Sequence, residues 1–217
     1  MVFWYSENMK NNFFLYSKYH SSREDERLGL FSALNEKYKI KKVLYPGSFV
    51  HITPSLAFPH VVYVDSYNKA ATFHQNPEVL IYIKKHKIYS QNSTVIFHKA
   101  DYTKNFEEKE KSFDLLLSQY AGFISRSCRK YLKIGGLLVT NNSHGDASMA
   151  FLDKGFKFIG IYNRRSDKKY SLSDKNLDSY FVPKKKGLKV TRKYLEETQQ
   201  GVGYTKSPSG YIFRRIQ

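Results

Sequence analysis

The chain is poor in cysteine and has no long apolar run. Its 217 residues include one cysteine, Cys128, which excludes an internal disulfide and a cysteine-based zinc site. A reducing, cytoplasmic compartment suits that composition. No stretch approaches 18 uninterrupted apolar residues, and the first residues carry an early acid and no long apolar core. We therefore expect neither a membrane-spanning helix nor a signal peptide.

Motifs of two enzyme classes are also missing. The sequence contains no Gly-x-x-x-x-Gly-Lys loop, which excludes a P-loop nucleotidase. Its seven histidines show no H-E-x-x-H or comparable ligand spacing. We therefore predict no catalytic metal.

Acidic residues are scarce, because 19 Asp and Glu stand against 36 Lys and Arg and leave a formal net charge of +17. Such an excess favours a nucleic acid, an anionic cofactor or another acidic partner. The alternative is that a Lys-rich composition alone makes the chain basic. About two fifths of the residues are hydrophobic, and Tyr and Phe are abundant, so we expect a substantial aromatic core.

Short apolar runs alternate with helical patterns from residue 42 onward. Strands are predicted at 42–46, 61–65, 94–98, 113–118, 136–141, 156–162 and 211–216. Between them, helices are predicted at 67–75, 77–85, 103–109, 121–132 and 146–153. The first five strands are apolar on both faces, which is typical of a parallel sheet buried on both sides. The pattern predicts an α/β, doubly wound, mainly parallel seven-stranded sheet.

Two segments flank or interrupt that predicted domain, 42–217. Residues 1–41 carry helical apolar spacing and are expected to form a helical cover over one face of the sheet. Residues 163–210 carry 12 Lys or Arg against 5 acids, together with five aromatic residues. We expect them to form a basic insertion or lid before the last strand, with a helix near 189–199.

The segment from Lys42 to Asp65 has the outline of a nucleotide-binding βαβ unit. A strand stops at Pro46–Gly47, a short helix begins at Pro54, and a second strand ends on the carboxylate of Asp65. Only one glycine, Gly47, is present in the turn where such units usually carry several.

With the sheet laid out, residues 42–162 and 211–216 resemble a class I, Rossmann-like S-adenosylmethionine-dependent methyltransferase. The resemblance rests on the VLYPG turn, Asp65 at the end of strand two, ADY after strand three, FDLLLSQYAG and YLKIGGLLVTNNS. It implies that S-adenosylmethionine is the cofactor. The last two strands then correspond to the antiparallel pair that is typical of this family.

The resemblance also implies roles for individual residues. The Gly47 turn, with Tyr45 and Ser48, would hold the methionine part of the cofactor. Asp65, with Ser66 beside it, would accept hydrogen bonds from both ribose hydroxyls, because one carboxylate can accept two. Asp101 and Tyr102 would meet the adenine, and Ser118 would face cofactor and substrate. In this family the glycine motif usually offers an acid and two or three glycines, whereas here Tyr45 stands for the acid and Phe49 and His51 for the later glycines.

Candidate catalytic residues follow the fourth and fifth strands. His144 could act as a general base near neutral pH, and Tyr120 could stack on substrate or cofactor. The alternatives are that Ser143 or Asp146 merely caps the next helix, and that Tyr120 belongs to the core. Ser118–Gln119–Tyr120–Ala121 lacks the proline pair of amino-group methylases of bases. Cys128 lies within a predicted helix, unlike the strand-end cysteine nucleophile of cytosine C5 methylases.

Two hypotheses of different kinds remain from the sequence. In the first, the protein is a methyltransferase whose acceptor is a nucleic acid or another anionic molecule that binds the basic segment 163–210. In the second, the altered glycine turn no longer holds a cofactor, and the scaffold is a nucleic-acid-binding or protein-interaction module. An NAD-dependent enzyme is a weaker third reading.

Overall fold

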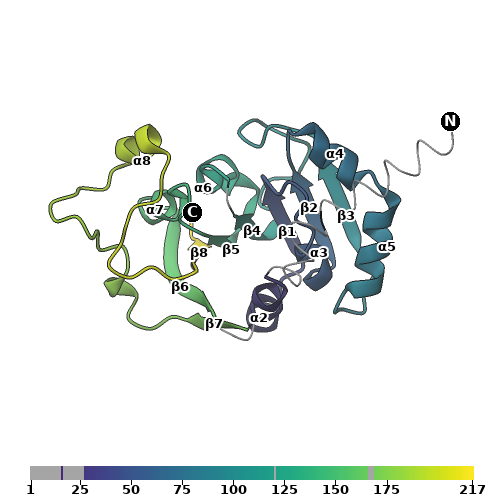
Figure 1. Ribbon diagram of the computed structural model, residues 1–217, viewed down its shortest axis with the longest axis horizontal. Coiled ribbons are helices and arrows are strands. Elements are labelled where there is room, and N and C mark those ends of the chain that lie inside the picture. The colour runs from purple at the N-terminus through teal and green to yellow at the C-terminus, as the bar shows by residue number, and fades with distance from the viewer. Residues whose placement is uncertain (1–15, 17–26, 120, 166–168) are drawn as a thin grey trace.

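The computed structural model describes residues 16, 27–119, 121–165 and 169–217. A single eight-stranded sheet, in the order β3-β2-β1-β4-β5-β8-β6-β7, runs through it (Figure 1). The strands are β1 (Lys42–Pro46), β2 (His60–Val64), β3 (Thr94–His98), β4 (Phe113–Ser118), β5 (Leu132–Thr140), β6 (Phe156–Arg164), β7 (Tyr170–Ser173) and β8 (Gly210–Arg215).

The first five strands are parallel, and the rest of the sheet is antiparallel. β1 pairs in parallel with β2 and β4, β2 with β3, and β4 with β5. β8 lies between β5 and β6 and is antiparallel to both. The predicted α/β sheet with a terminal antiparallel pair is therefore confirmed, and all seven predicted strands are present.

An eighth strand, β7, extends the sheet within the segment predicted as a basic insertion. It pairs antiparallel with β6, with Ile161 opposite Ser173. Its sequence, YSLS, alternates polar and apolar residues over only four positions and stays half-buried. So short a run does not stand out from a loop in the sequence, which is why it was not predicted.

Helices cover one face of the sheet with a large aromatic core. They are α2 (Leu28–Tyr38), α3 (Pro54–Ala57), α4 (Asn68–His74) and α5 (Pro77–His86). α5 begins as predicted, with Pro77 in its first turn and the Asn76 side chain accepting a hydrogen bond from the Glu78 N–H. Phe31, Phe58 and Phe73 are fully buried on this side, together with strand residues such as Val43 and Tyr63.

Shorter helices cover the other face. They are α6 (Ile124–Ser127), the 3-10 turn η2 (Arg129–Tyr131), α7 (Asp146–Phe151) and α8 (Arg192–Thr198), while a further 3-10 turn, η3, spans Leu177–Ser179. Ile124, Ala147 and Leu195 bury the inner sides of α6, α7 and α8 against strand residues such as Leu116 and Phe213. The doubly wound arrangement therefore has one core on each face of the sheet.

Two helix predictions were wrong in detail. No helix forms at 103–109, because the Asp101 side chain accepts hydrogen bonds from Thr103 and turns the chain there instead. The predicted helix 121–132 is split into α6 and η2, with Cys128 between them at ψ near 0. The helical cover predicted for residues 1–41 lies outside the described residues, except for Tyr16 and 27–41. Within the described ranges, no helix has the length and apolar character needed to cross a membrane.

Candidate active site

The carboxyl ends of β1, β2 and β4 meet around the Gly47 turn. The Gly47 N–H donates to the Val64 carbonyl at 2.8 Å, which ties the end of β1 to the end of β2. Gly47 has a φ of +62°, and a Cβ there would lie 2.6 Å from the Ala121 Cβ and 3.6 Å from the Tyr102 ring. Glycine is therefore required both by the backbone conformation and by the close approach of the loop after β4.

Asp65, at the end of β2, organises the loop that follows Gly47. One carboxylate oxygen accepts the Phe49 N–H at 2.9 Å, and the other accepts the Tyr67 N–H at 2.9 Å. Phe49 itself adopts a left-handed φ of +50°, a conformation that this bond stabilises. A carboxylate has about four lone-pair directions, so each oxygen keeps capacity for a further hydroxyl donor.

Of the three bulky residues that stand for the family's acid and later glycines, Tyr45 and His51 point into the core and Phe49 does not. Tyr45 and His51 are buried, and the Tyr45 hydroxyl lies 3.0 Å from His51 Nδ1 in a shared hydrogen bond. The His51 ring lies beside Phe31 of α2. Phe49 instead packs its ring against Tyr67. The expectation that Tyr45 faces the cofactor is not favoured by this placement, since its polar group is turned to the core.

Ser48 and Tyr102 remain close to the turn. Ser48 is buried, and its Oγ has no hydrogen-bond partner among the described residues. The Tyr102 hydroxyl accepts the Gly122 N–H at 3.3 Å, and burial raises its pKa above the ordinary value. The bond between Tyr102 and Gly122 and the close approach of Gly47 to Ala121 bring the loops after β1, β3 and β4 together.

Two other predicted cofactor residues face solvent. Asp101 is exposed, and its Oδ1 accepts the Thr103 N–H at 2.9 Å and the Thr103 hydroxyl at 2.7 Å. These bonds lower the pKa of Asp101. Ser66 is also exposed, next to Asp65. Both residues are thus more exposed than Ser48, which is buried, and Asp65, which is half-buried.

Ser118, at the end of β4, belongs to a buried network centred on Asp146. Its hydroxyl donates to Asp146 Oδ2 at 2.5 Å. The N–H of Ser125, in α6, lies 3.1 Å from both carboxylate oxygens of Asp146, and the Ser125 hydroxyl donates to Oδ1. Burial raises the pKa of Asp146 to about 6, while the hydroxyls of Ser118, Ser125 and Thr140 act in the opposite direction.

From the sequence, Asp146 was expected only as an alternative helix cap. In the structure Gly145 is the residue before α7, and Asp146 reaches across to α6. The available signal was an acid six positions after the end of β5, together with one serine at the end of β4 and another seven positions further on. Only the folded chain places these groups together, because they are 21 and 28 positions apart.

The two predicted catalytic residues are not brought into this network. His144 is exposed on the turn before α7 and makes no hydrogen bond to any described residue. Tyr120 lies outside the described residues. Among the residues that the structure describes, no group of three His, Cys, Asp or Glu side chains could hold a metal ion.

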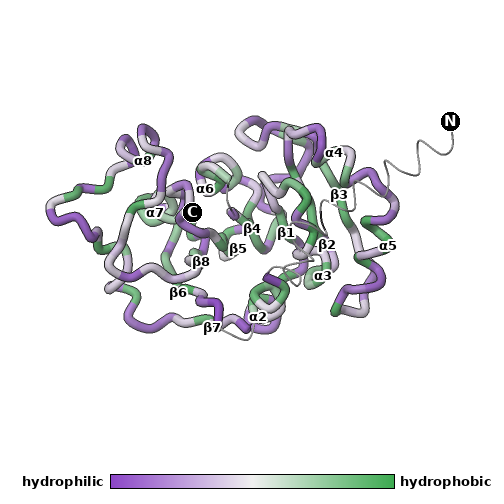
Figure 2. Tube along the Cα trace, in the orientation of Figure 1, coloured by the Kyte–Doolittle hydropathy of each residue, from purple (hydrophilic) through white to green (hydrophobic). Residues whose placement is uncertain are grey.

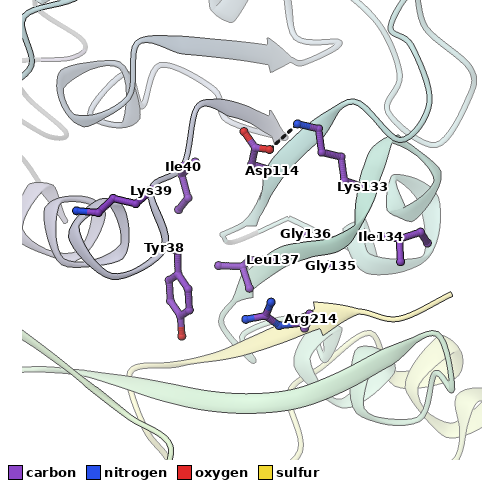
Figure 3. Close-up of a pocket in the computed structure, with 10 residues that line it drawn as sticks. All are labelled: Tyr38, Lys39, Ile40, Asp114, Lys133, Ile134, Gly135, Gly136, Leu137 and Arg214. Atoms are coloured by element: carbon purple, nitrogen blue, oxygen red, sulfur yellow. Dashed lines mark hydrogen bonds and ion pairs between the residues drawn. The ribbon is translucent and has the colours of Figure 1, made fainter.

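A cavity of about 300 Å³ lies at the opposite edge of the sheet, where the parallel strands begin (Figure 3). In Figure 3, Arg214 and Tyr38 extend beside Leu137, while Lys39 and Ile134 point away. Lys133 pairs with Asp114 at 2.6 Å on its rim. The Gly135–Gly136 pair, which carried much of the family resemblance, lines this cavity and not the candidate active site.

Comparison with known proteins finds similarity at the level of structure only. No protein-family model matches the sequence, and no curated protein matches it. The N-methyltransferase NodS from Bradyrhizobium japonicum WM9, in complex with S-adenosyl-L-homocysteine, is similar with a TM-score of 0.50 and 12% identity, over 90% of this chain and 87% of that chain. A methyltransferase from Geobacter sulfurreducens has a TM-score of 0.48 and 10% identity, over 88% and 80%. The chain therefore has the fold of class I S-adenosylmethionine-dependent methyltransferases.

Proposed function

We propose that this protein is an S-adenosylmethionine-dependent methyltransferase whose cofactor lies across the carboxyl ends of β1, β2 and β4. The observation that carries the proposal is the position of Gly47, at the end of β1, beside Asp65, at the end of the neighbouring strand β2. A glycine turn that tolerates no side chain stands next to a strand-end carboxylate with hydrogen-bonding capacity left over. Ligands in open α/β sheets bind at this edge of the sheet.

The residues present fit that cofactor in three places. Asp65 would accept the ribose hydroxyls with its remaining lone pairs. Ser48 offers a buried hydroxyl that has no partner among the described residues, beside the Gly47 turn. The Tyr102 ring, half-buried between the loops, would supply an apolar wall for the adenine, with Asp101 and Ser66 on the rim.

The acceptor side would be formed by the ends of β4 and β5. S-adenosylmethionine supplies the methyl group on a sulfonium, so the enzyme mainly has to position the two partners. Ser118 donates its proton to Asp146, and therefore only its lone pairs remain for a ligand. His144 is exposed on the adjoining turn and would act as a base where the acceptor must lose a proton. Tyr120, two positions after the end of β4, would stack on substrate or cofactor.

We propose the same organisation for the chain as a whole. Residues 42–217 would form the methyltransferase domain and residues 1–41 its helical cover. The basic segment 163–210, apart from the strand β7 that it adds to the sheet, would form a lid that carries an anionic acceptor. Cys128 is buried, and burial raises the pKa of its thiol to about 12, which makes it unreactive. A cytoplasmic location agrees with one free thiol.

Calorimetric titration with S-adenosylhomocysteine tests the proposal. Asp65→Ala should weaken binding at least about tenfold, because bonds to a charged group contribute about 1.5–3 kcal/mol. Asp114→Ala is the matched control, since Asp114 also accepts two backbone N–H groups, from Lys41 and Lys42, but at the opposite edge of the sheet. Its affinity should equal that of the wild type. No binding by the wild type at millimolar ligand would refute the proposal.

The non-enzymatic scaffold remains the second candidate, and one observation favours it. Ala121 stands directly against Gly47, and each oxygen of Asp65 already holds a backbone N–H. A scaffold that had lost its cofactor would keep these contacts as a closed turn. This candidate would be identified if the wild-type protein binds nucleic acid or another protein but gives no heat of binding in calorimetric titration with S-adenosylhomocysteine.

A further inference from the structure

The segment 182–193, here called the basic loop, has an unusual concentration of charge. Within twelve residues it carries six basic side chains and no acid: Lys184, Lys185, Lys186, Lys189, Arg192 and Lys193. All six are exposed. The four lysines from 184 to 189 form no ion pair with any described residue. In Figure 2 the loop forms a hydrophilic tip at the left, flanked by hydrophobic stretches on both sides.

Those hydrophobic stretches line a groove of about 220 Å³ between the basic loop and α7. Its walls include Phe151 and Leu152 from the end of α7, Pro183, Leu188 and Val190 from the basic loop, and Tyr204. Phe151 is 48% exposed although it stacks on the buried Phe181 ring, with centroids 4.2 Å apart and an interplanar angle of 8°. One flat aromatic face of the groove is thus held in place and remains accessible.

The basic loop is connected to the acceptor side of the candidate active site. It leads into α8, whose end packs on the turn after β5, where the Gly201 N–H donates to the Ser143 carbonyl at 3.2 Å. Arg192, Arg126 and Arg129 line a second cavity of about 240 Å³ between α8 and α6. Glu196 and Asp153 line the same cavity and pair with Arg126 and Arg129, so Arg192 is the arginine of this cavity that has no ion pair with a described residue and extends the basic surface from the loop toward α6.

We propose that the basic loop and its groove bind single-stranded nucleic acid, and that this strand carries the methyl acceptor. The lysines would contact successive phosphates, and a base would enter the groove and stack on Phe151. Unpaired lysines alternating with apolar wall residues, as in Leu188–Lys189–Val190, suit a ligand with a charged backbone and flat apolar bases. A duplex hides its bases, so it could use the lysines but not the groove. The acceptor role rests on the proposed methyltransferase function, whereas binding of the strand does not.

Fluorescence anisotropy with labelled 20-nucleotide RNA, DNA and duplex probes tests this, without cofactor and over a range of salt. The variant Lys185→Glu/Lys186→Glu should weaken single-strand binding at least about tenfold and reduce its salt dependence, since each lost phosphate contact removes about 0.7 from the logarithmic salt slope. Lys84→Glu/Lys85→Glu, in exposed positions on α5, changes the net charge equally and should shift affinity less than about threefold. RNA and DNA probes show which single strand is preferred.

A second pair of variants tests the groove. Phe151→Ala should weaken single-strand binding about fivefold or more at every salt concentration, because stacking does not depend on charge. Ile81→Ala removes an apolar side chain of similar exposure from α5 and should leave the affinity for single strands unchanged. Circular dichroism confirms that each variant is folded.

Three results would overturn the inference. The first is an equal loss of single-strand affinity in the two lysine double variants, and the second is duplex binding as tight as or tighter than single-strand binding. The third is binding of poly-glutamate that is weakened by the same substitutions to the same extent. Titration of the same variants with S-adenosylhomocysteine separates the two proposals. If cofactor binds and the strand does not, only the inference fails. If the strand binds and cofactor does not, the methyltransferase proposal and the acceptor role fail together, and strand binding stands.

Discussion

The two halves of the carboxyl edge of the sheet are held in opposite ways. Around β1 and β2, buried rings hold the loop: the Tyr45 hydroxyl shares a hydrogen bond with His51, and His74 bonds the Phe49 carbonyl at 3.1 Å. Around β4 and β5, the buried carboxyl of Asp146 accepts hydrogen bonds from Ser118 in β4 and Ser125 in α6. The comparison shows that a loop can be ordered by removing charge from the interior or by surrounding one charge with donors.

The two halves respond to pH with opposite sign. Burial lowers the pKa of His74 to about 4, so its ring is neutral when folded and stacks on Phe97 at 4.5 Å. The unfolded state then binds the proton more tightly than the folded state, so stability is lost as the pH falls from 6.5, the pKa of an unfolded histidine, toward 4. Burial raises the pKa of Asp146 to about 6, so its stability contribution is lost as the pH rises from about 4 to 6.

The largest expected effect comes from removing the carboxyl. Asp146→Ala would leave the Ser118 hydroxyl and the Ser125 N–H and hydroxyl without their acceptor inside the protein. We expect a loss of about 4 kcal/mol in unfolding free energy, because each buried orphaned group costs about 1–3 kcal/mol. Urea unfolding at pH 7 measures it. A loss below about 1 kcal/mol would show that water replaces the carboxyl.

The contrast in pH response comes next. A shift of about two units corresponds to about 3 kcal/mol for each residue, since one unit is about 1.4 kcal/mol. Asp146→Asn should remove the component of stability that decreases from pH 4 to 6, and His74→Phe the component that increases over the same range. Urea unfolding at pH 4.5 and 7 gives both differences. Identical changes in the two variants would contradict the opposite signs.

The smallest expected difference is the one between two glycine variants, and it separates the cost of backbone strain from the cost of close packing. Gly47→Ala adds a left-handed alanine and a Cβ 2.6 Å from Ala121, whereas Gly135→Ala, at φ +84°, adds a Cβ that meets nothing within 4 Å. The Gly135 variant should lose about 1–2 kcal/mol from strain alone. The Gly47 variant should lose about 1–3 kcal/mol more from overpacking. Thermal unfolding of both proteins compares them, and equal losses would show that the Ala121 loop yields without cost.

The sheet could be predicted from the sequence because its strands are compact apolar runs with polar boundaries. β3 and β4 have the predicted bounds, and Asp65 follows β2 directly. β7 could not be predicted, because its four residues become a strand only by pairing with β6. The site was harder still. That Phe49 would donate its N–H to Asp65 depends on a left-handed backbone, and the Asp146 network depends on contacts between elements distant in sequence.

The position of β8 has a consequence for how the molecule comes into being. Of the eight strands, β8 is synthesised after all the others, yet it lies between β5 and β6 and pairs with both (Figure 1). Until it is made, both neighbours present an unpaired edge, which is a template for aggregation. The Arg215 side chain then donates to the carbonyls of Arg129 and Lys130. Synthesis of residues 210–215 therefore closes the gap between β5 and β6, and a nascent chain that stalls before them exposes two strand edges.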